Sequence, residues 1–324
     1  MFLDPCTDKQ VYEVNFLTFI RKFYIIKFEN EEMADLFEKK YLKSENGKTI
    51  FDFNMLVPMP NEMDIKETSE KNDWMAAYLA AVNPHSAITV EGYEKWDSER
   101  FQHIRSELEK NAFFREVRWD SNEAPDIKSV QEGEKYISNL EKYGYDTWYM
   151  WCIHNWGTKW NSYGYSRYEF DKSVISFFTA WSAPFQIFKK LCHDNPNMSF
   201  KVYYADEDRG FNLGIYQYGQ QSCSCIWHEE DHWQAMRDQL ADAIWDMNME
   251  QMAFIEKAKT YTASFESENF KVFVWANSEE EALEIAREYG LDSGFEDKEP
   301  KITLSKEGEK ADCDYIISKC DILQ

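Results

Sequence analysis

The segment from Asp146 to Trp160 contains four tryptophans within thirteen positions, and this concentration limits how the chain can fold. Indole side chains are large and mostly apolar, so they are stable in a packed core or in an interface that a partner covers. The residues before Gly157 are largely aromatic or β-branched, which favours a strand over Trp148–Asn155. Alternate side chains of such a strand face opposite sides, with Trp148, Met150 and Cys152 on one side and Tyr149, Trp151 and Ile153 on the other.

Two interpretations of these aromatic residues remain open. In the first they are core residues, and Trp156 and Trp160 brace a Gly-Thr-Lys turn. In the second they line a pocket or docking surface that combines aromatic rings with one cation. Such surfaces are typical of interface hot spots and of sites that stack bases. The predicted binding residues are Trp148, Trp151, His154, Asn155, Trp156, Lys159, Trp160 and Trp181.

Strand and helix patterns alternate along the rest of the chain. Residues 11–29 are rich in β-branched and aromatic residues and predict one or two strands. Asn30 is expected to cap a helix over 31–42, and Thr49–Val57 to form the next strand. Further strands are expected at 165–170, 174–179, 200–204 and 211–218, with a helix at 183–194.

Residues 61–135 differ from their surroundings because their pattern is polar and helical. Helices are expected at 74–82 and 94–114, and a third helix is expected to end at Tyr143 with Gly144 as its C-cap. The sequence thus predicts an α+β fold, namely a ferredoxin-like sandwich over 1–228 with a helical insertion at about 61–135.

Two further parts are predicted after this domain. A single long helix is expected over 229–259, because apolar residues recur there at three- and four-residue steps. Residues 260–324 contain sixteen Asp and Glu against seven Lys and Arg, and they predict a small acidic α+β module. Ser278 and Glu281 form a capping box that should open a helix ending at Gly290.

The charge and the cysteines exclude several classes of protein. A formal net charge of −23 repels phosphate, so direct nucleic-acid binding is disfavoured. The charge fits either a soluble acidic protein or an acidic surface that docks on a basic, often nucleic-acid-binding, partner. No apolar run is long enough for a membrane helix, and no signal peptide is expected. Seven cysteines, an odd number, indicate reduced thiols in a cytoplasm.

The run from Cys223 to His232 is the most suggestive for metal chemistry. Its last five residues formally match the H-E-x-x-H zinc motif, but two acids separate the glutamate from the second histidine, which argues against a metalloprotease. A structural zinc site is the alternative, with Cys223, Cys225, His228 and His232 as ligands. Otherwise the cysteines are strand residues and the histidines lie exposed at a helix start. No other cofactor is expected.

Several motifs resemble one known family. They are Asn54-Met-Leu-Val-Pro-Met-Pro60, Asp146-Thr-Trp-Tyr-Met-Trp151, Asn155-Trp-Gly-Thr-Lys-Trp160 and Thr179-Ala-Trp-Ser-Ala-Pro184. In this order they are similar to the YubB/Api92-like group of phage and plasmid proteins over about residues 11–220. The resemblance implies a ferredoxin-like domain and accessory mobile-element biology, and it implies no catalytic residue. Thr147 makes the second motif one residue longer than in the family.

These observations predict a non-catalytic phage or plasmid protein that binds and sequesters a host protein. A basic or nucleic-acid-binding component of a host defence system is the expected partner, and self-association is also compatible with the sequence. The alternative is a metal- or nucleotide-dependent hydrolase that uses the tryptophan-rich segment or the Cys223–His232 cluster. A deep pocket that holds Lys159 with a carboxylate would favour the hydrolase, whereas exposed aromatic rings would favour the binder.

Overall fold

The computed structural model describes residues 21–45, 47–110, 117–232, 234–265, 270–292, 299–305 and 316–318. The strand predicted over 11–20 lies outside these residues. The chain divides into two compact units. The first unit comprises 1–14, 52–161 and 182–190, and the second comprises 15–51, 162–181 and 191–324. Each unit is described separately below.

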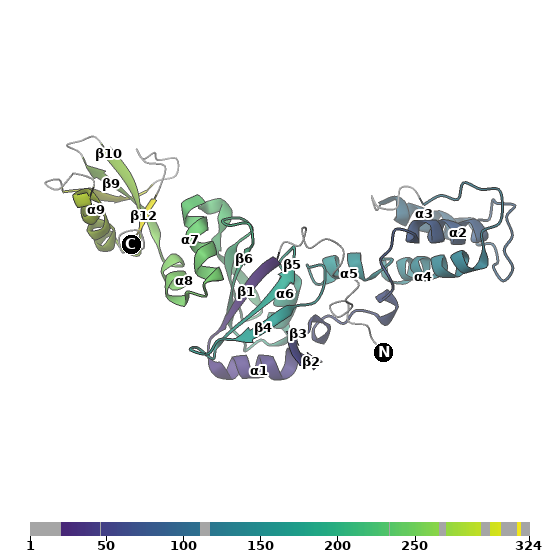
Figure 1. Cartoon of the computed structure of the whole chain (residues 1–324), viewed down its shortest axis with the longest axis horizontal. Coiled ribbons are helices and arrows are strands. Elements are labelled where there is room, and N and C mark those ends of the chain that lie inside the picture. Colours follow the sequence, from purple (N-terminus) through teal and green to yellow (C-terminus); the bar gives the residue numbers. More distant parts are fainter. Residues whose placement is uncertain are drawn as a thin grey trace. The chain divides into compact units, whose positions relative to one another are not determined.

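A six-stranded antiparallel sheet dominates the second unit. Its strands follow the order β4-β5-β1-β6-β7-β8, so β1, drawn in purple in Figure 1, lies between two strands that are distant in sequence. The strands are β1 (Arg21–Phe28), β4 (Tyr163–Arg167), β5 (Val174–Ala180), β6 (Phe200–Asp206), β7 (Gly214–Gly219) and β8 (Ser222–His228).

The order of elements confirms the ferredoxin-like α+β fold. Helix α1 (Glu31–Tyr41) follows β1, and helix α6 (Phe185–Asp194) joins β5 to β6. The chain therefore runs β1-α1-β4-β5-α6-β6, and the four strands lie in the order β4-β5-β1-β6, which is the split βαβ arrangement of this fold. The hairpin of β2 (Leu42–Glu45) and β3 (Lys48–Phe51) and the first unit's residues 52–161 are inserted between α1 and β4.

Local signals explain why β1 and α1 form where they do. Alternate residues of β1 face opposite sides of the sheet, and both sides are buried. Phe28 packs on Phe37 of α1 with ring centroids 5.3 Å apart. The predicted cap of α1 is confirmed, because the Asn30 side chain accepts a hydrogen bond from the Met33 N–H at 3.0 Å.

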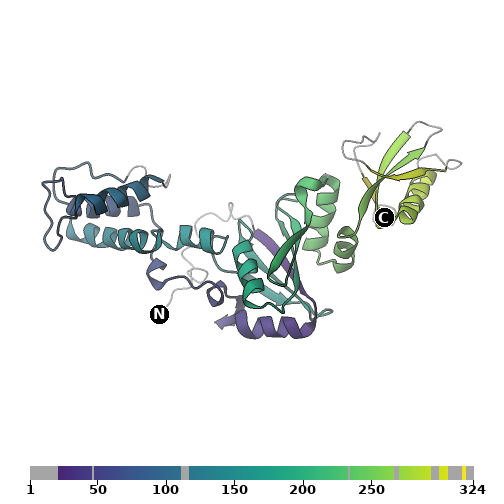
Figure 2. The same cartoon turned by 180° about the vertical axis from the view of Figure 1, so that it is seen from behind.

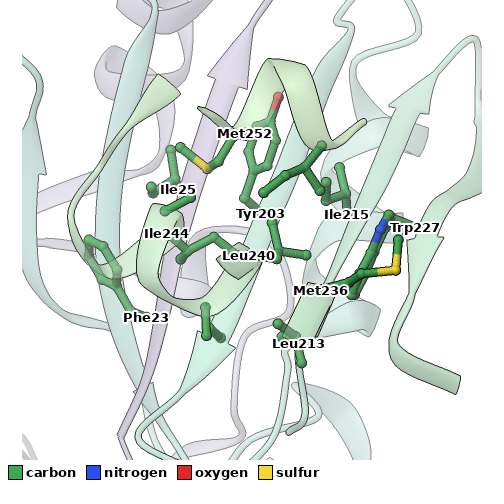
Figure 3. Close-up of a cluster of buried hydrophobic side chains, with 14 of the residues drawn as sticks. Phe23, Ile25, Tyr203, Leu213, Ile215, Trp227, Met236, Leu240, Ile244 and Met252 are labelled. Atoms are coloured by element: carbon green, nitrogen blue, oxygen red, sulfur yellow. The ribbon is translucent and has the colours of Figure 1, made fainter. Parts of the chain in front are cut away.

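The opposite face of the sheet packs on two helices, where the sequence predicts one. Figure 3 shows Phe23, Ile25 and Tyr203 of the sheet together with Leu240, Ile244 and Met252 of these helices in one apolar cluster. The single long helix predicted over 229–259 is wrong. The structure instead has the 3₁₀ turn η5 (Glu229–Asp231), α7 (Gln234–Trp245) and α8 (Met249–Ile255), and then β9 from Lys259.

The break between α7 and α8 has a local cause. Met247 takes a left-handed φ of 53°, and the Asn248 side chain accepts a hydrogen bond from the Gln251 N–H at 3.0 Å. An asparagine at this position caps a new helix instead of continuing the old one. The apolar periodicity runs through the break because both helices cover the same sheet.

A second, four-stranded sheet follows within the same unit. Its order is β11-β9-β10-β12, from β9 (Lys259–Phe265), β10 (Phe270–Ala276), β11 (Lys301–Leu304) and β12 (Ile316–Ser318). Helix α9 (Glu279–Asp292) begins with the predicted capping box. The Ser278 hydroxyl accepts from the Glu281 N–H at 3.1 Å, and the Glu281 carboxylate accepts from the Asn277 N–H at 2.7 Å. The helix continues past Gly290, so its predicted end is wrong.

The first unit is mainly helical. It contains η2 (Phe53–Met55), η3 (Asn61–Met63), α2 (Lys71–Val82), α3 (Ser98–Lys110), α4 (Ile127–Tyr143) and α5 (Trp148–Asn155). Helices α2 and α4 lie side by side in Figures 1 and 2. Gly144 caps α4 as predicted, with a left-handed φ of 77°. The strand predicted over 49–57 is too long, since β3 ends at Phe51. None of the described helices is long and apolar enough to cross a membrane.

The contact between α2 and α4 predicts a marked effect of Gly133→Ala. A Cβ atom at Gly133 would lie 1.9 Å from the backbone oxygen of Trp74. Alanine in a helix normally stabilises relative to glycine, but this clash is with backbone and can be relieved only by moving the helices apart. We expect the free energy of unfolding to fall by about 1–3 kcal/mol, measured by urea denaturation with circular dichroism. The exposed Ser138→Ala change on α4 is the control. A Gly133→Ala variant as stable as this control would contradict the close packing.

Candidate functional site

The tryptophan-rich segment forms a helix, and the strand predicted over 148–155 is wrong. Helix α5 begins after Thr147, whose hydroxyl accepts a hydrogen bond from the Tyr149 N–H at 3.4 Å. Thr147, the residue that lengthens the family motif, is thus the N-cap. Within residues 148–156 the buried side chains are Trp151, Cys152 and Trp156, a spacing that fits a helical period and does not fit alternation.

Trp156 belongs to the core. Its side chain is 3% exposed, and its indole N–H donates a hydrogen bond to the Val57 carbonyl oxygen at 2.8 Å. Its ring lies edge-on to those of Trp151 and Phe53, with centroid distances of 5.5 and 5.8 Å. Trp156 and Trp151 are therefore packing residues that attach α5 to the segment around Val57, and they do not present a surface to a partner.

The end of α5 depends on Gly157. Its φ of 85° is left-handed, and its N–H donates to the Cys152 and Ile153 carbonyls at 3.2 and 3.1 Å. A Cβ atom here would lie 2.8 Å from the Ala183 carbonyl oxygen, so a larger residue does not fit. The Asn155 side-chain amide donates a hydrogen bond to the Trp151 carbonyl oxygen at 2.9 Å, a contact within α5 itself.

Lys159 and two aromatic rings form a partly exposed cluster, named here the Lys159 patch: Tyr149, Lys159 and Trp160. The Lys159 ammonium lies 4.8 Å from the centroid of the Trp160 ring and 5.5 Å from that of Tyr149. Burial lowers the pKa of Lys159, and the Glu67 carboxylate partly offsets this. All three side chains are between buried and exposed, so the patch is open to solvent on one side.

A buried polar network lies close to this patch. The Lys71 ammonium is 2.7 Å from Asp146 Oδ2 and 2.6 Å from Glu67 Oε1, and the Thr147 hydroxyl donates to Glu67 Oε2 at 2.5 Å. Asp146 is 1% exposed, and its Oδ1 atom has no hydrogen-bond partner. The sequence gives no signal that Lys71 and Glu67 contact this motif. The start of α2 resembles many other helix starts, and Lys71 lies 75 positions before Asp146.

Three other predicted binding residues are Trp148, which contacts the patch through Tyr149, and His154 and Trp181. Trp148 packs against Tyr149 edge-on at 5.7 Å. The exposed His154 lies with its ring 5.2 Å from that of Tyr145, and its Nδ1 is 2.8 Å from the Met150 carbonyl oxygen. Trp181 belongs to the second unit, directly after β5, where it is 38% exposed with a left-handed φ of 70°.

The four predicted zinc ligands do not gather around a common point. Cys223 and Cys225 are exposed on one side of β8, opposite Tyr218 and Tyr216 of β7. His228 Nδ1 accepts from the Glu230 N–H at 3.3 Å. The His232 ring stacks on Trp227, with centroids 4.1 Å apart. Throughout the part of the chain that the structure describes, no group of three or more His, Cys, Asp or Glu side chains is placed to hold a metal ion. His232 is thus a stacking residue in this fold.

A match to a known family model supports the ferredoxin-like fold. Residues 155–262 match the family model described as the ferredoxin-like domain in Api92-like protein, a segment that begins within the Asn155–Trp160 motif. The crystal structure of protein Api92 from Yersinia pseudotuberculosis is similar at 8% sequence identity, over 64% of this chain and 97% of that one, with a TM-score of 0.28. No curated protein matches the chain. The resemblance predicted from the motifs is confirmed.

Proposed function

We propose that this protein, a member of the Api92-like family through its ferredoxin-like domain, is a non-catalytic accessory protein of a phage or plasmid that binds and sequesters a host protein in the bacterial cytoplasm. The observation that carries the proposal is the Lys159 patch. A cation held over two partly exposed aromatic rings is a surface that a protein partner can cover with favourable energy.

The patch has the composition of an interface hot spot. Tyr149 and Trp160 supply large apolar area at a small loss of conformational entropy. Lys159 adds a positive charge that can donate hydrogen bonds. The stem of Lys159 is already half-buried between its neighbours. Little side-chain entropy is therefore left to lose when a partner binds, which favours affinity.

The charge of the chain supports a basic partner. At a net charge of −23, the protein attracts positively charged surfaces and accelerates association with them. The excess of acids over bases in residues 260–324 extends this field over the last fifth of the sequence. A host protein that binds nucleic acid has a basic surface, which this negative charge complements. By binding that surface, the acidic protein would compete with the nucleic acid.

The hydrolase alternative has less support from the geometry. The carboxylate that influences Lys159 is Glu67, and this carboxylate is already engaged by the Lys71 ammonium and the Thr147 hydroxyl. A general base needs a lone pair that is available to its substrate. A cavity that the described residues of the first unit form is lined by none of the eight predicted binding residues.

Affinity capture from a bacterial host, followed by mass spectrometry, tests the proposal. The Lys159→Ala/Trp160→Ala variant should recover at least tenfold less of the partner than the wild type, about the effect of losing one or two hot-spot residues. Lys135→Ala/Phe170→Ala is the matched control, because it also removes one exposed lysine and one exposed aromatic ring. Trp156→Ala is unsuitable here, since Trp156 is a core residue.

The captured protein is then purified and titrated directly. We expect its affinity to fall as salt is added, because exposed opposite charges are screened. Equal capture by the patch variant and the control would exclude the Lys159 patch as the binding surface. Failure to retain any host protein in near-stoichiometric amount would contradict the proposed function as a whole.

A further inference from the structure

A cavity of about 660 Å³ lies in the first unit, between α2, α3 and the segment that leads into α4. These helices are the blue and teal group of Figure 2. Sites for small molecules in proteins typically enclose roughly 300–1,000 Å³, so the volume fits a ligand with one or two rings. Apolar side chains that include Leu79, Ile88 and Phe101 form one part of the wall, named here the apolar floor, and polar side chains form the rest.

The polar part of the wall carries one sign of charge. Arg105 and Arg118 line the cavity beside Trp119, and none of the lining residues that the structure describes is acidic. This is unusual in a chain with 59 acidic and 36 basic residues. The Arg105 and Arg118 side chains are 35% and 80% exposed. Their guanidinium groups are donors for an anion, and the indole ring of Trp119 is a flat surface for a ring.

One wall of the cavity is held in place by Lys95. Its ammonium donates to the Ala81 carbonyl at 2.9 Å and also to the Ile88 carbonyl, and it thereby ties the end of α2 to the loop that follows. Within this loop Asn83 Oδ1 accepts from the His85 N–H at 2.9 Å, and the Ser86 hydroxyl accepts from the Ile88 N–H at 3.1 Å. The wall exists before a ligand arrives.

The opposite wall is fixed by Arg105 and Trp119. Arg105 donates to the Val117 carbonyl at 2.8 Å, and the Trp119 indole N–H donates to the Glu123 carbonyl at 3.1 Å. Each arginine also has one exposed carboxylate nearby: Glu109 lies 3.8 Å from Arg105, and Asp120 lies 3.4 Å from Arg118. Exposed pairs of this kind are weak, so both guanidinium groups retain attraction for a ligand.

We propose that this cavity binds a small organic anion, namely a flat ring that carries a carboxylate or a phosphate. The ring lies against Trp119 and the apolar floor, and the anionic group meets Arg105 and Arg118. This site is independent of the Lys159 patch and of the proposed sequestration of a host protein.

Matched pairs of probes test this chemistry on the full-length protein. Indole-3-acetate and adenosine 5′-monophosphate are compared with their uncharged counterparts, indole-3-acetamide and adenosine, and with the cation tryptamine. Binding is detected by saturation-transfer NMR and quantified by calorimetry. At least one anion should bind about tenfold or more tightly than its uncharged counterpart, as expected for charge-assisted hydrogen bonds to arginine.

Three variants locate the binding. Ala87→Trp fills the cavity from its exposed rim and should abolish the signal, while Arg118→Gln should weaken it severalfold. Lys110→Gln on α3 removes an exposed cation outside the cavity and should leave it unchanged. Circular dichroism shows whether each variant is folded. The proposal is overturned if neither anion binds, if the uncharged counterparts bind equally well, or if a folded Ala87→Trp variant binds as the wild type does.

Discussion

Replacing Trp156 by alanine is expected to lower the free energy of unfolding by about 3–5 kcal/mol, the usual range for truncating a buried tryptophan. The substitution opens a cavity between the Trp151 and Phe53 rings. It also leaves the Val57 carbonyl without the indole N–H that it accepts from at 2.8 Å. Both losses weaken the attachment of α5.

Urea denaturation followed by circular dichroism measures this effect, because the chain contains twelve tryptophans and fluorescence would not report on one of them. Trp156→Phe keeps an aromatic ring and should lose less stability than Trp156→Ala. Trp160→Ala is the comparison for a partly exposed tryptophan of the same motif and should have a clearly smaller effect. If Trp156→Ala and Trp160→Ala were equally stable, the division of this motif into core and surface residues would be wrong.

Replacing Lys71 by methionine is expected to destabilise the protein by a similar amount, about 3–5 kcal/mol, because it leaves Asp146 buried without its cation. Burial lowers the pKa of Lys71, but the Asp146 and Glu67 carboxylates outweigh this and raise it above its ordinary value. Lys71 thus remains charged at neutral pH. The Lys71→Met/Asp146→Leu double variant removes both charges and should recover most of the loss, as replacement of buried ion pairs often does.

The pH dependence of the Lys71→Met variant has a definite sign. Burial raises the pKa of Asp146, and Lys71 opposes this in the wild type. A carboxyl group whose pKa is higher in the folded state stabilises the fold below its unfolded pKa, and this contribution is lost as the pH rises through the folded pKa. Without Lys71 the pKa of Asp146 rises further, so acidification from neutral pH should narrow the stability difference between variant and wild type.

Two controls make this experiment decisive. Lys135→Met removes an exposed lysine that pairs with Glu132 on α4, and it should change stability little. The single variants and the double variant together form a cycle that isolates the coupling between Lys71 and Asp146. A Lys71→Met variant that matches Lys135→Met in stability at every pH would show that the two side chains do not form a buried pair.

Much of the ferredoxin-like domain could be predicted from the sequence because its signals are local. The β1 strand is rich in β-branched and aromatic residues, and Asn30 has a side chain that can cap a helix start. Gly144 and the Ser278 capping box act on atoms within a few residues of themselves. Each of these features depends on backbone geometry that neighbouring residues decide.

The candidate site could be predicted only in part. The role of Lys159 and Trp160 as binding residues stays a prediction, whereas the strand predicted over Trp148–Asn155 is wrong. Aromatic residues favour strands on average, and their burial against a specific partner overrides that preference. The same limit applies to His232, because no local pattern in the sequence indicates that its ring stacks on Trp227.

The sequence alone determined the helix caps at Asn30, Gly144 and Ser278, the charge and the resemblance to the Api92-like family, since capping, composition and motifs act over short distances along the chain. Only the tertiary structure decided that Trp156 is core while Trp160 stays partly exposed, that Lys71 pairs with Asp146 across 75 positions, and that two arginines line one cavity. Burial and ion pairing depend on which distant segments meet. Contacts between distant segments follow from the packing of the whole unit, so no local sequence pattern predicts them.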